Sequence, residues 1–237
     1  MPFNIRGVPI VNRYVERDRE MSTIEGSLRP GLPNTQRRIV VLHGLGGTGK
    51  TQLSLAYARK HRDDHTAIFW LNGQTRDSLK QSIAGVARSL PANQLPDSAR
   101  KRLQQGSEEL EEVIDEVLEW FGKRENTQWL LIYDNVDRDA SDRVRDPEAY
   151  DIRKYFPKPD HGSIIITTRR LQLRHLGDEL KVNTMTTEEG IDLLKNTLGD
   201  FQNGKNILFD QPRNQTTRNR LDEPKGTCCS KTPSYFH

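Results

Sequence analysis

Four short apolar segments limit what this chain can fold into more than any other feature. Each is built around a continuous apolar run, which is typical of strands buried on both faces of a parallel sheet. Segments with apolar residues at three- and four-residue spacing lie between them and indicate helices. The sequence therefore predicts an α/β fold with helices on both faces of a mostly parallel sheet. The expected strands are 38–43, 67–71, 129–133 and 163–167, with 180–182 as a short fifth.

The helical spacing also sets the expected helix positions. The segment 108–121 has the clearest amphipathic pattern, and the last helix opens with Thr186 and Glu189 in the arrangement of a capping box. The expected helices are 18–28, 50–61, 78–90, 108–121 and 186–198.

Composition indicates that part of the chain lies outside a packed core. Residues of the set AVILMFWYC make up 33%, and the 17 glycines raise this share to about 40%, below the roughly 45–50% of ordinary globular domains. We expect residues 1–36 to form an irregular N-terminal linker and residues 37–200 to form the folded domain. Residues 201–237 are expected to be disordered, since Asn, Gln, Arg, Thr and Pro dominate there.

Charge and cysteine content exclude several classes of function. The formal net charge of +3 lies entirely in residues 202–237, which hold six Lys and Arg against three Asp and Glu, so the remainder is unlike a polybasic nucleic-acid-binding domain. Cys228 and Cys229 are adjacent, which excludes a disulfide framework and a cysteine zinc site. The lack of an 18-residue apolar run or a signal sequence favours a cytoplasmic protein with neither a membrane nor a nucleic acid as partner.

The first apolar strand runs into a glycine-rich turn, Gly44-Leu-Gly-Gly-Thr-Gly-Lys50-Thr51, which fits the phosphate-loop pattern G-x-x-x-x-G-K-[ST]. Glycines allow successive backbone N–H groups to point at phosphate oxygens, and the following helix offers its positive N-terminal end. Lys50 is expected to contact the β- and γ-phosphates, and Thr51 to bind Mg²⁺. The residues expected to bind the nucleotide at this loop are Gly44, Gly46, Gly47, Thr48, Gly49, Lys50, Thr51 and Gln52.

Two later strand ends supply the other candidate residues. Asp134 ends the third strand in the form of a Walker B aspartate, which would hold Mg²⁺ together with Thr51. Arg169 follows the fourth strand, and it would contact the γ-phosphate if that strand lies beside the phosphate-loop strand, as in additional-strand P-loop NTPases. A solvated pair of Arg169 and Arg170 explains the same residues equally well. The candidates for catalysis are Lys50, Asp134 and Arg169.

Together these segments resemble the NB-ARC branch of the STAND NTPases, the nucleotide-switch module of plant, animal and fungal immune receptors and related signalling ATPases, with the fungal members most similar. The resemblance runs from about residue 14 to residue 200. It implies a P-loop NTPase fold of the additional-strand type, a three-layer α/β/α sandwich with a mostly parallel five-stranded sheet. The segments that carry it are Val15–Glu20, Ile39–Thr51, Phe69–Leu71, Leu130–Asp134, Ser163–Arg169 and Met185–Leu194.

The resemblance also implies roles for individual residues. In the family the segment at Arg17 packs near the adenine, the phosphate loop holds the phosphates, and the arginine at position 169 senses the γ-phosphate. This chain departs from the pattern at Glu16, where Gly is usual, and at Asn135, where a second acid is usual. An amide cannot accept a proton from the attacking water, so we expect slow or no hydrolysis unless Asp137 substitutes.

The family continues into helical and winged-helix subdomains, and residues 199–237 show the motifs of neither, so we expect a nucleotide-binding subdomain alone. The first hypothesis is a signalling module that binds ADP or ATP with Mg²⁺ as a switch, with at most slow hydrolysis. The alternative is a truncated decoy or regulator with a weak nucleotide site, which pairs with itself or with full-length NLR-like relatives. An active AAA-type ATPase is less favoured, because no lid domain is visible.

Overall fold

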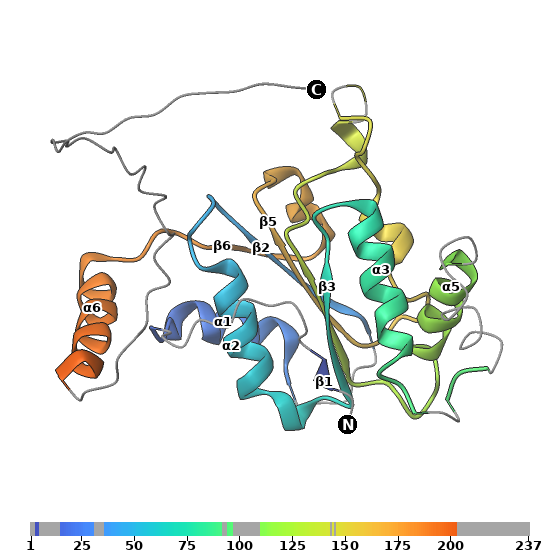
Figure 1. Ribbon diagram of the computed structural model, residues 1–237, viewed down its shortest axis with the longest axis horizontal. Helices are drawn as coiled ribbons and strands as arrows, with labels where there is room; N and C mark the ends of the chain where they lie inside the picture. Colours follow the sequence, from blue (N-terminus) through green and yellow to red (C-terminus); the bar gives the residue numbers. More distant parts are fainter. Residues whose placement is uncertain are drawn as a thin grey trace, which may run out of the picture.

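A parallel sheet of six strands forms the centre of the molecule in a computed structural model that describes residues 3–4, 15–30, 36–91, 94–96, 110–142, 144 and 146–202 (Figure 1). The strand order is β1-β3-β4-β5-β2-β6, and every pairing is parallel. The strands are β1 (Phe3–Asn4), β2 (Arg38–His43), β3 (Ala67–Asn72), β4 (Trp129–Asp134), β5 (Ser163–Thr168) and β6 (Asp178–Lys181).

The five expected strands are confirmed, and a sixth is added. The four long strands begin at the expected residues, whereas β6 begins two residues before the expected 180. The extra strand is β1, which lies in a segment expected to be irregular. Its residues pair with Ile68 and Phe69 of β3. A strand of two residues shows no periodicity in the sequence, so only the pairing itself reveals it.

Helices cover both faces of the sheet and complete the expected three-layer α/β/α sandwich (Figure 1). The helices are α1 (Asp18–Leu28) and α2 (Lys50–Lys60) on one face, α3 (Arg76–Ala87) and α5 (Leu110–Trp120) on the other, and α6 (Thr187–Gln202) near the end of the described chain. Short 3-10 segments occupy Arg62–Asp64, Ala140–Asp142, Ile152–Tyr155 and Leu171–Leu176. The expected helices are thus confirmed, with ends that shift by a few residues.

Alternate residues of the central strands face opposite helix layers, which explains why the apolar runs are continuous. In β5, Ile164 and Ile166 belong to the core shared with α3 and α5, while Ile165 belongs to the core shared with α1 and α2. All three side chains are fully buried. A strand covered on both faces needs apolar residues at every position, because neither side meets water.

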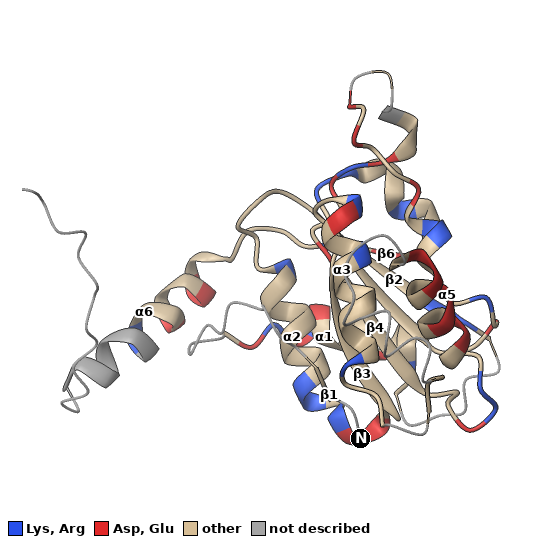
Figure 2. Cartoon of the chain, turned by 45° about the vertical axis from the view of Figure 1, so that its right-hand side comes forward, with Lys and Arg blue, Asp and Glu red and all other residues tan. Residues whose placement is uncertain are grey.

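The last helix, α6, stands apart from these layers (Figures 1 and 2). The expected capping box starts it: the Thr186 N–H donates to Glu189 Oε2 (2.7 Å), and the Glu189 N–H donates to Thr186 Oγ1 (3.2 Å). Ile191 and Leu194 are 44% and 60% exposed. The described part of α6 therefore presents apolar side chains to solvent.

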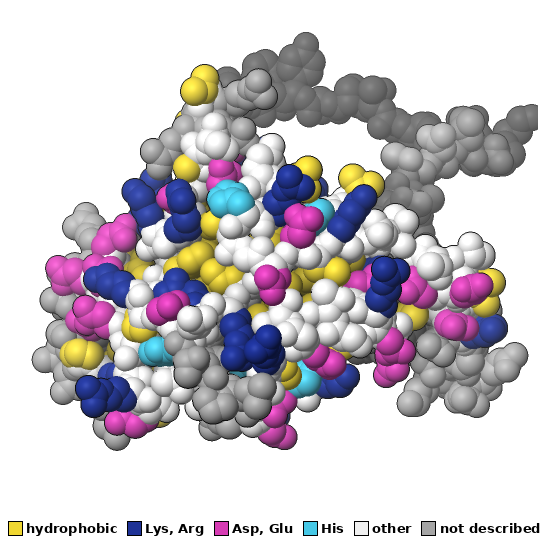
Figure 3. All heavy atoms as spheres, turned by 180° about the vertical axis from the view of Figure 1, so that it is seen from behind, with side chains coloured by type: hydrophobic (Ala, Val, Ile, Leu, Met, Phe, Trp, Pro, Cys, Tyr) yellow, Lys and Arg dark blue, Asp and Glu magenta, His cyan; other side chains and the backbone are white. Residues whose placement is uncertain are grey.

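Charged side chains of both signs are interleaved on the face shown in Figure 3. Acidic residues gather along α5, while Lys and Arg residues are spread over several elements (Figure 2). Within the described ranges, no helix is both long and apolar enough to cross a membrane.

We predict that Gly162→Ala destabilises the fold by about 2–4 kcal/mol. Gly162 precedes β5 with a φ of 84°, and a Cβ there would lie 2.2 Å from Cε2 of the buried Trp129. The matched control is Gly26→Ala in α1, where a Cβ meets nothing within 4 Å and should stabilise the helix by about 0.5–1 kcal/mol. Urea unfolding measures both, and equal stability of Gly162→Ala and wild type would contradict the prediction.

Candidate functional site

The glycine-rich loop lies at the carboxyl end of β2, between the last residue of that strand and the start of α2. Gly44 has a φ of 149°, and a Cβ on it would lie 2.4 Å from the Val182 carbonyl oxygen. The Val182 N–H in turn donates to the His43 carbonyl (2.8 Å), which fastens the chain after β6 to the loop. Glycine at position 44 is therefore required by close packing, and the positive N-terminal end of α2 directly follows the loop.

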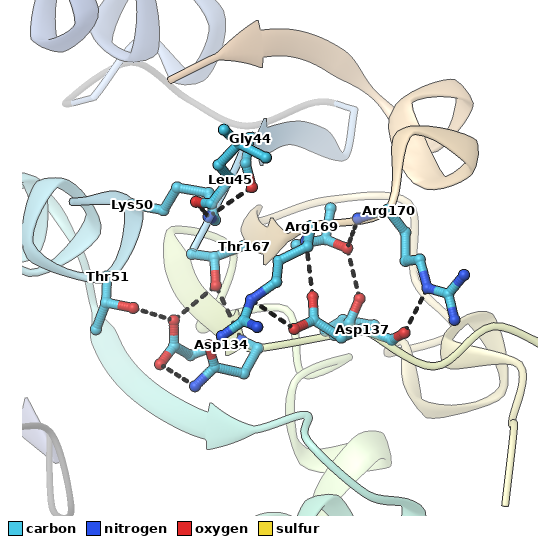
Figure 4. Close-up of polar contacts among 12 residues, drawn as sticks. Gly44, Leu45, Lys50, Thr51, Asp134, Asp137, Thr167, Arg169 and Arg170 are labelled. Atoms are coloured by element: carbon cyan, nitrogen blue, oxygen red, sulfur yellow. Dashed lines mark hydrogen bonds and ion pairs between the residues drawn. The ribbon is translucent and has the colours of Figure 1, made fainter. Parts of the chain in front are cut away.

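The Lys50 ammonium lies inside the loop. Nζ donates to the carbonyl oxygens of Gly44 (2.9 Å) and Leu45 (2.7 Å), and the residue is only 8% exposed (Figure 4). Burial lowers the pKa of Lys50, and the Asp137 carboxylate partly opposes this shift. A buried cation among backbone dipoles is suited to an anionic ligand, because a phosphate would offset the cost of its burial.

The Asp134 carboxylate joins three elements at the end of β4. Oδ1 accepts hydrogen bonds from Thr51 Oγ1 of α2 (2.9 Å) and Thr167 Oγ1 of β5 (2.6 Å), and Oδ2 accepts one from Asn135 Nδ2 (3.2 Å). Burial raises the pKa of Asp134, and the two threonine hydroxyls oppose this shift. The predicted metal ligands Thr51 and Asp134 are thus brought together, and their hydroxyl and carboxylate oxygens are the donors that Mg²⁺ prefers.

The pair Thr167-Thr168 belongs to the site, and the sequence analysis did not identify it. The Thr167 hydroxyl accepts from the Asn135 N–H (2.9 Å) as well as donating to Asp134. The Thr168 hydroxyl donates to the Val136 carbonyl (2.6 Å). Two consecutive hydroxyl residues at the end of a buried apolar strand were the available signal, because their side chains point to opposite faces of the sheet.

Asn135 provides no acid–base group at the end of β4. It has a φ of 61°, and its side-chain amide donates to the Asp134 carboxylate. The position where a second acid was expected therefore supplies a hydrogen-bond donor to Asp134 instead of a proton acceptor.

The structure distinguishes the two adjacent arginines, which the sequence left equivalent. The Arg169 guanidinium lies against the loop, since a Cβ on Gly46 would be 3.3 Å from its Cζ. The Arg169 N–H donates to Asp137 Oδ1 (2.7 Å), and its Nε lies 3.3 Å from Asp137 Oδ2. Arg170 extends in another direction, with Nε donating to the Asp137 carbonyl (2.8 Å; Figure 4). Arg169 is thus the arginine beside the phosphate loop.

The Arg17 side chain fastens the N-terminal segment to the loop. It is 5% exposed, with Nη1 donating to the Thr48 carbonyl (2.9 Å) and Nη2 donating to the Asn183 carbonyl (3.1 Å). Nη2 also contacts Glu20. Two of the expected nucleotide-binding residues, Arg17 and Thr48, are therefore bonded to each other.

A hollow of about 360 Å³ opens beside the start of α1 and the second half of α2. Its lining residues are Glu16, Arg17, Asp18, Met21, Ala56 and Lys60. Glu16 thus lines the hollow, at the position where the family pattern has Gly.

Gln52, the last of the expected nucleotide-binding residues, lies in the first turn of α2, directly after Thr51.

The chain is similar to known proteins in sequence and in fold. The NB-ARC domain family matches residues 17–203. A nucleotide-binding leucine-rich repeat (NLR)-like protein of Hyaloscypha variabilis is 21% identical over 213 residues, which cover 85% of this chain and 20% of that protein. The chain thus spans about a fifth of the length of this relative. The crystal structure of Cdc6p from Pyrobaculum aerophilum superposes with a TM-score of 0.54 at 15% identity, over 83% of this chain and 52% of that one.

We predict that Asp134→Asn removes part of the pH dependence that wild type shows in its free energy of unfolding. Burial raises the pKa of Asp134, so the native state binds its proton more tightly than the unfolded state does. Stability from this group is therefore present at low pH and lost as the pH rises through the raised pKa. Urea unfolding between about pH 4 and pH 8 tests this, since the loss should be absent from the variant.

The control for that experiment is Asp63→Asn, which makes the same change from carboxylate to amide at an exposed residue. It should reproduce the pH dependence of wild type. A marked destabilisation of Asp134→Asn at neutral pH would show instead that the charged carboxylate contributes more through its three hydrogen bonds than it loses by burial.

Proposed function

Because the chain belongs to the NB-ARC domain family, we propose that it is an ADP- and ATP-binding signalling NTPase module that acts as a nucleotide-dependent switch, with slow or no hydrolysis. The family and the P-loop NTPase fold make it a nucleotide-binding module. The switch, the hydrolysis rate and a cytoplasmic site of action are the proposed part. The observation that carries the proposal is the convergence of Lys50, Thr51, Asp134 and Arg169 at the carboxyl ends of β2, β4 and β5.

Each side chain of this group has a role that its contacts support. The backbone of the loop and Lys50 would hold the phosphates, because a buried ammonium and a helix N-terminus both favour anions. Thr51 and Asp134 would hold Mg²⁺, which neutralises phosphate charge when it is bound. Arg169 lies beside Gly46 and would contact the γ-phosphate, so that its environment differs between the ATP and ADP states.

Slow hydrolysis follows from the surroundings of Asp134. This carboxylate accepts hydrogen bonds from Thr51, Thr167 and Asn135, and Asn135 itself provides an amide where a base is needed. Binding and orientation of the nucleotide are thus well supported in this chain, whereas deprotonation of an attacking water is not. A module that binds nucleotide firmly but hydrolyses it slowly would keep its nucleotide bound, and its state would depend on whether that nucleotide is ADP or ATP.

A second candidate function is a decoy or regulatory interaction protein that pairs with itself or with full-length NLR-like relatives. The observation that favours it is the exposed apolar surface at Leu45, Ile191 and Leu194, of which Leu45 is 75% exposed.

Nucleotide retention by wild type and Lys50→Ala tests the proposal. Purified wild type should release near-stoichiometric ADP on denaturation, and Lys50→Ala should bind ADP about 10- to 100-fold more weakly because the phosphates lose a charged donor. Denaturation, ion-exchange chromatography of the supernatant and titration calorimetry measure both quantities. The control is Lys80→Ala, which removes an ammonium paired with Glu111 on the opposite helix layer and should bind like wild type.

Two outcomes would decide against the switch. Wild type without nucleotide, and without binding on addition of Mg-ATP, contradicts nucleotide-dependent function and leaves the interaction hypothesis. Partner binding that survives in Lys50→Ala also favours the decoy, because a switch should lose nucleotide and partner binding together.

A further inference from the structure

We propose that Asp137 competes with the γ-phosphate for Arg169. Its carboxylate holds Arg169 and thereby sets the preference of the site between ADP and ATP. This inference rests on the proposed function, because it concerns the same nucleotide site. It assigns to Asp137 a specificity-determining role that differs from substitution for the acid missing at Asn135.

The backbone places Asp137 opposite Arg169. After β4 the chain remains bonded to β5, because the Val136 N–H donates to the Thr167 carbonyl (2.9 Å) and the Thr168 hydroxyl donates back to the Val136 carbonyl (2.6 Å). The Asp137 N–H closes a tight turn onto the Asn135 carbonyl (2.9 Å). These bonds fix the Cα of Asp137 next to the end of β5, so the ion pair does not depend on two freely moving side chains.

Both oxygens of the Asp137 carboxylate are engaged by Arg169. Oδ1 accepts the Arg169 backbone N–H at 2.7 Å, and Oδ2 lies 3.3 Å from its Nε (Figure 4). The Asp137 carbonyl accepts from Arg170, which anchors the turn on its other side. A carboxylate already bonded in this way is poorly placed to take a proton from water, and it is well placed to hold a guanidinium.

The pair lies within the electrostatic reach of the phosphate loop. Asp137 opposes the lowering of the Lys50 pKa by burial, and it adds to the raising of the Asp134 pKa by burial. The Arg169 guanidinium itself lies against Gly46 of the loop. A third phosphate would therefore meet an arginine that is already paired with Asp137, whereas a diphosphate leaves the pair undisturbed.

The Asp137–Arg169 ion pair is accessible enough to solvent for a phosphate to replace Asp137 as the partner of Arg169. The Arg169 side chain is 64% exposed and the Asp137 side chain 30% exposed, so solvent screens their attraction. Exposed ion pairs of this type change an equilibrium by a factor of about two to five. This is enough to bias the choice between two nucleotides without blocking either of them.

The test compares the affinities of wild type and Asp137→Asn for Mg-ADP and for Mg-AMPPNP, a non-hydrolysable ATP analogue, by titration calorimetry. Asparagine retains an oxygen for the Arg169 N–H and removes the charge that holds the guanidinium. We expect the ratio Kd(ADP)/Kd(AMPPNP) to rise about two- to fivefold. Asp137→Ala, which also loses the oxygen, should shift the ratio in the same direction and serves as the second variant.

Two controls separate the pair from a general charge effect. In an Arg169→Gln background, Asp137→Asn should leave the ratio unchanged, because the double-mutant cycle removes the interaction under test. Asp146→Asn is the matched charge control: Asp146 Oδ2 lies 3.3 Å from Arg138 Nε, and Oδ1 accepts the Glu148 N–H at 3.0 Å. It should leave the ratio as in wild type.

The outcomes distinguish this inference from the proposed function. Wild type that binds neither nucleotide overturns the proposed function and the inference with it. Wild type that binds both, with a ratio unmoved by Asp137→Asn or moved equally in the Arg169→Gln background, overturns the inference alone. Loss of hydrolysis in Asp137→Asn with an unchanged ratio overturns it as well, and assigns the acid–base role to Asp137.

Discussion

The buried carboxylate of Asp134 is the interaction on which the geometry of the site depends. Its oxygens receive hydrogen bonds from α2, from β5 and from the adjacent Asn135, so one side chain aligns the start of a helix with the ends of two strands. Removing a carboxylate from water is costly, and the three donors offset that cost only while α2, β4 and β5 keep their places. The same group that aligns the site is the one suited to bind a metal.

The strand order gives this arrangement its functional consequence. Because β5 lies between β4 and β2, the residues that follow β5 emerge between the Asp134 carboxylate and the phosphate loop. The cations Lys50 and Arg169 then lie close enough to the anions Asp134 and Asp137 to interact electrostatically. Under the proposed function, each added phosphate charge would change which of these ion pairs is favourable.

Asn135, which departs from the family pattern, and Arg17, which follows it, also shape the surroundings of the site. Asn135 stabilises Asp134 by donating a hydrogen bond, but it offers no base. Arg17 uses its buried guanidinium to join the Thr48 and Asn183 carbonyls, so the N-terminal segment, the loop and the chain leading to α6 share one side chain. Arg17 thus connects the loop to the segment that precedes α6, and Ile191 and Leu194 of α6 are exposed.

The sequence alone determined the α/β class, the five longer strands, the helices, the phosphate loop and the candidacy of Asp134, because these depend on local apolar periodicity and on a motif of adjacent residues. The tertiary structure decided what depends on residues distant in the chain. It pairs the two-residue β1 with β3, separates Arg169 from Arg170, brings Asp137 to Arg169 and directs Arg17 to the Thr48 carbonyl. Side-chain direction at a strand end follows from which strand lies alongside, and that neighbour is set by the order of the whole sheet.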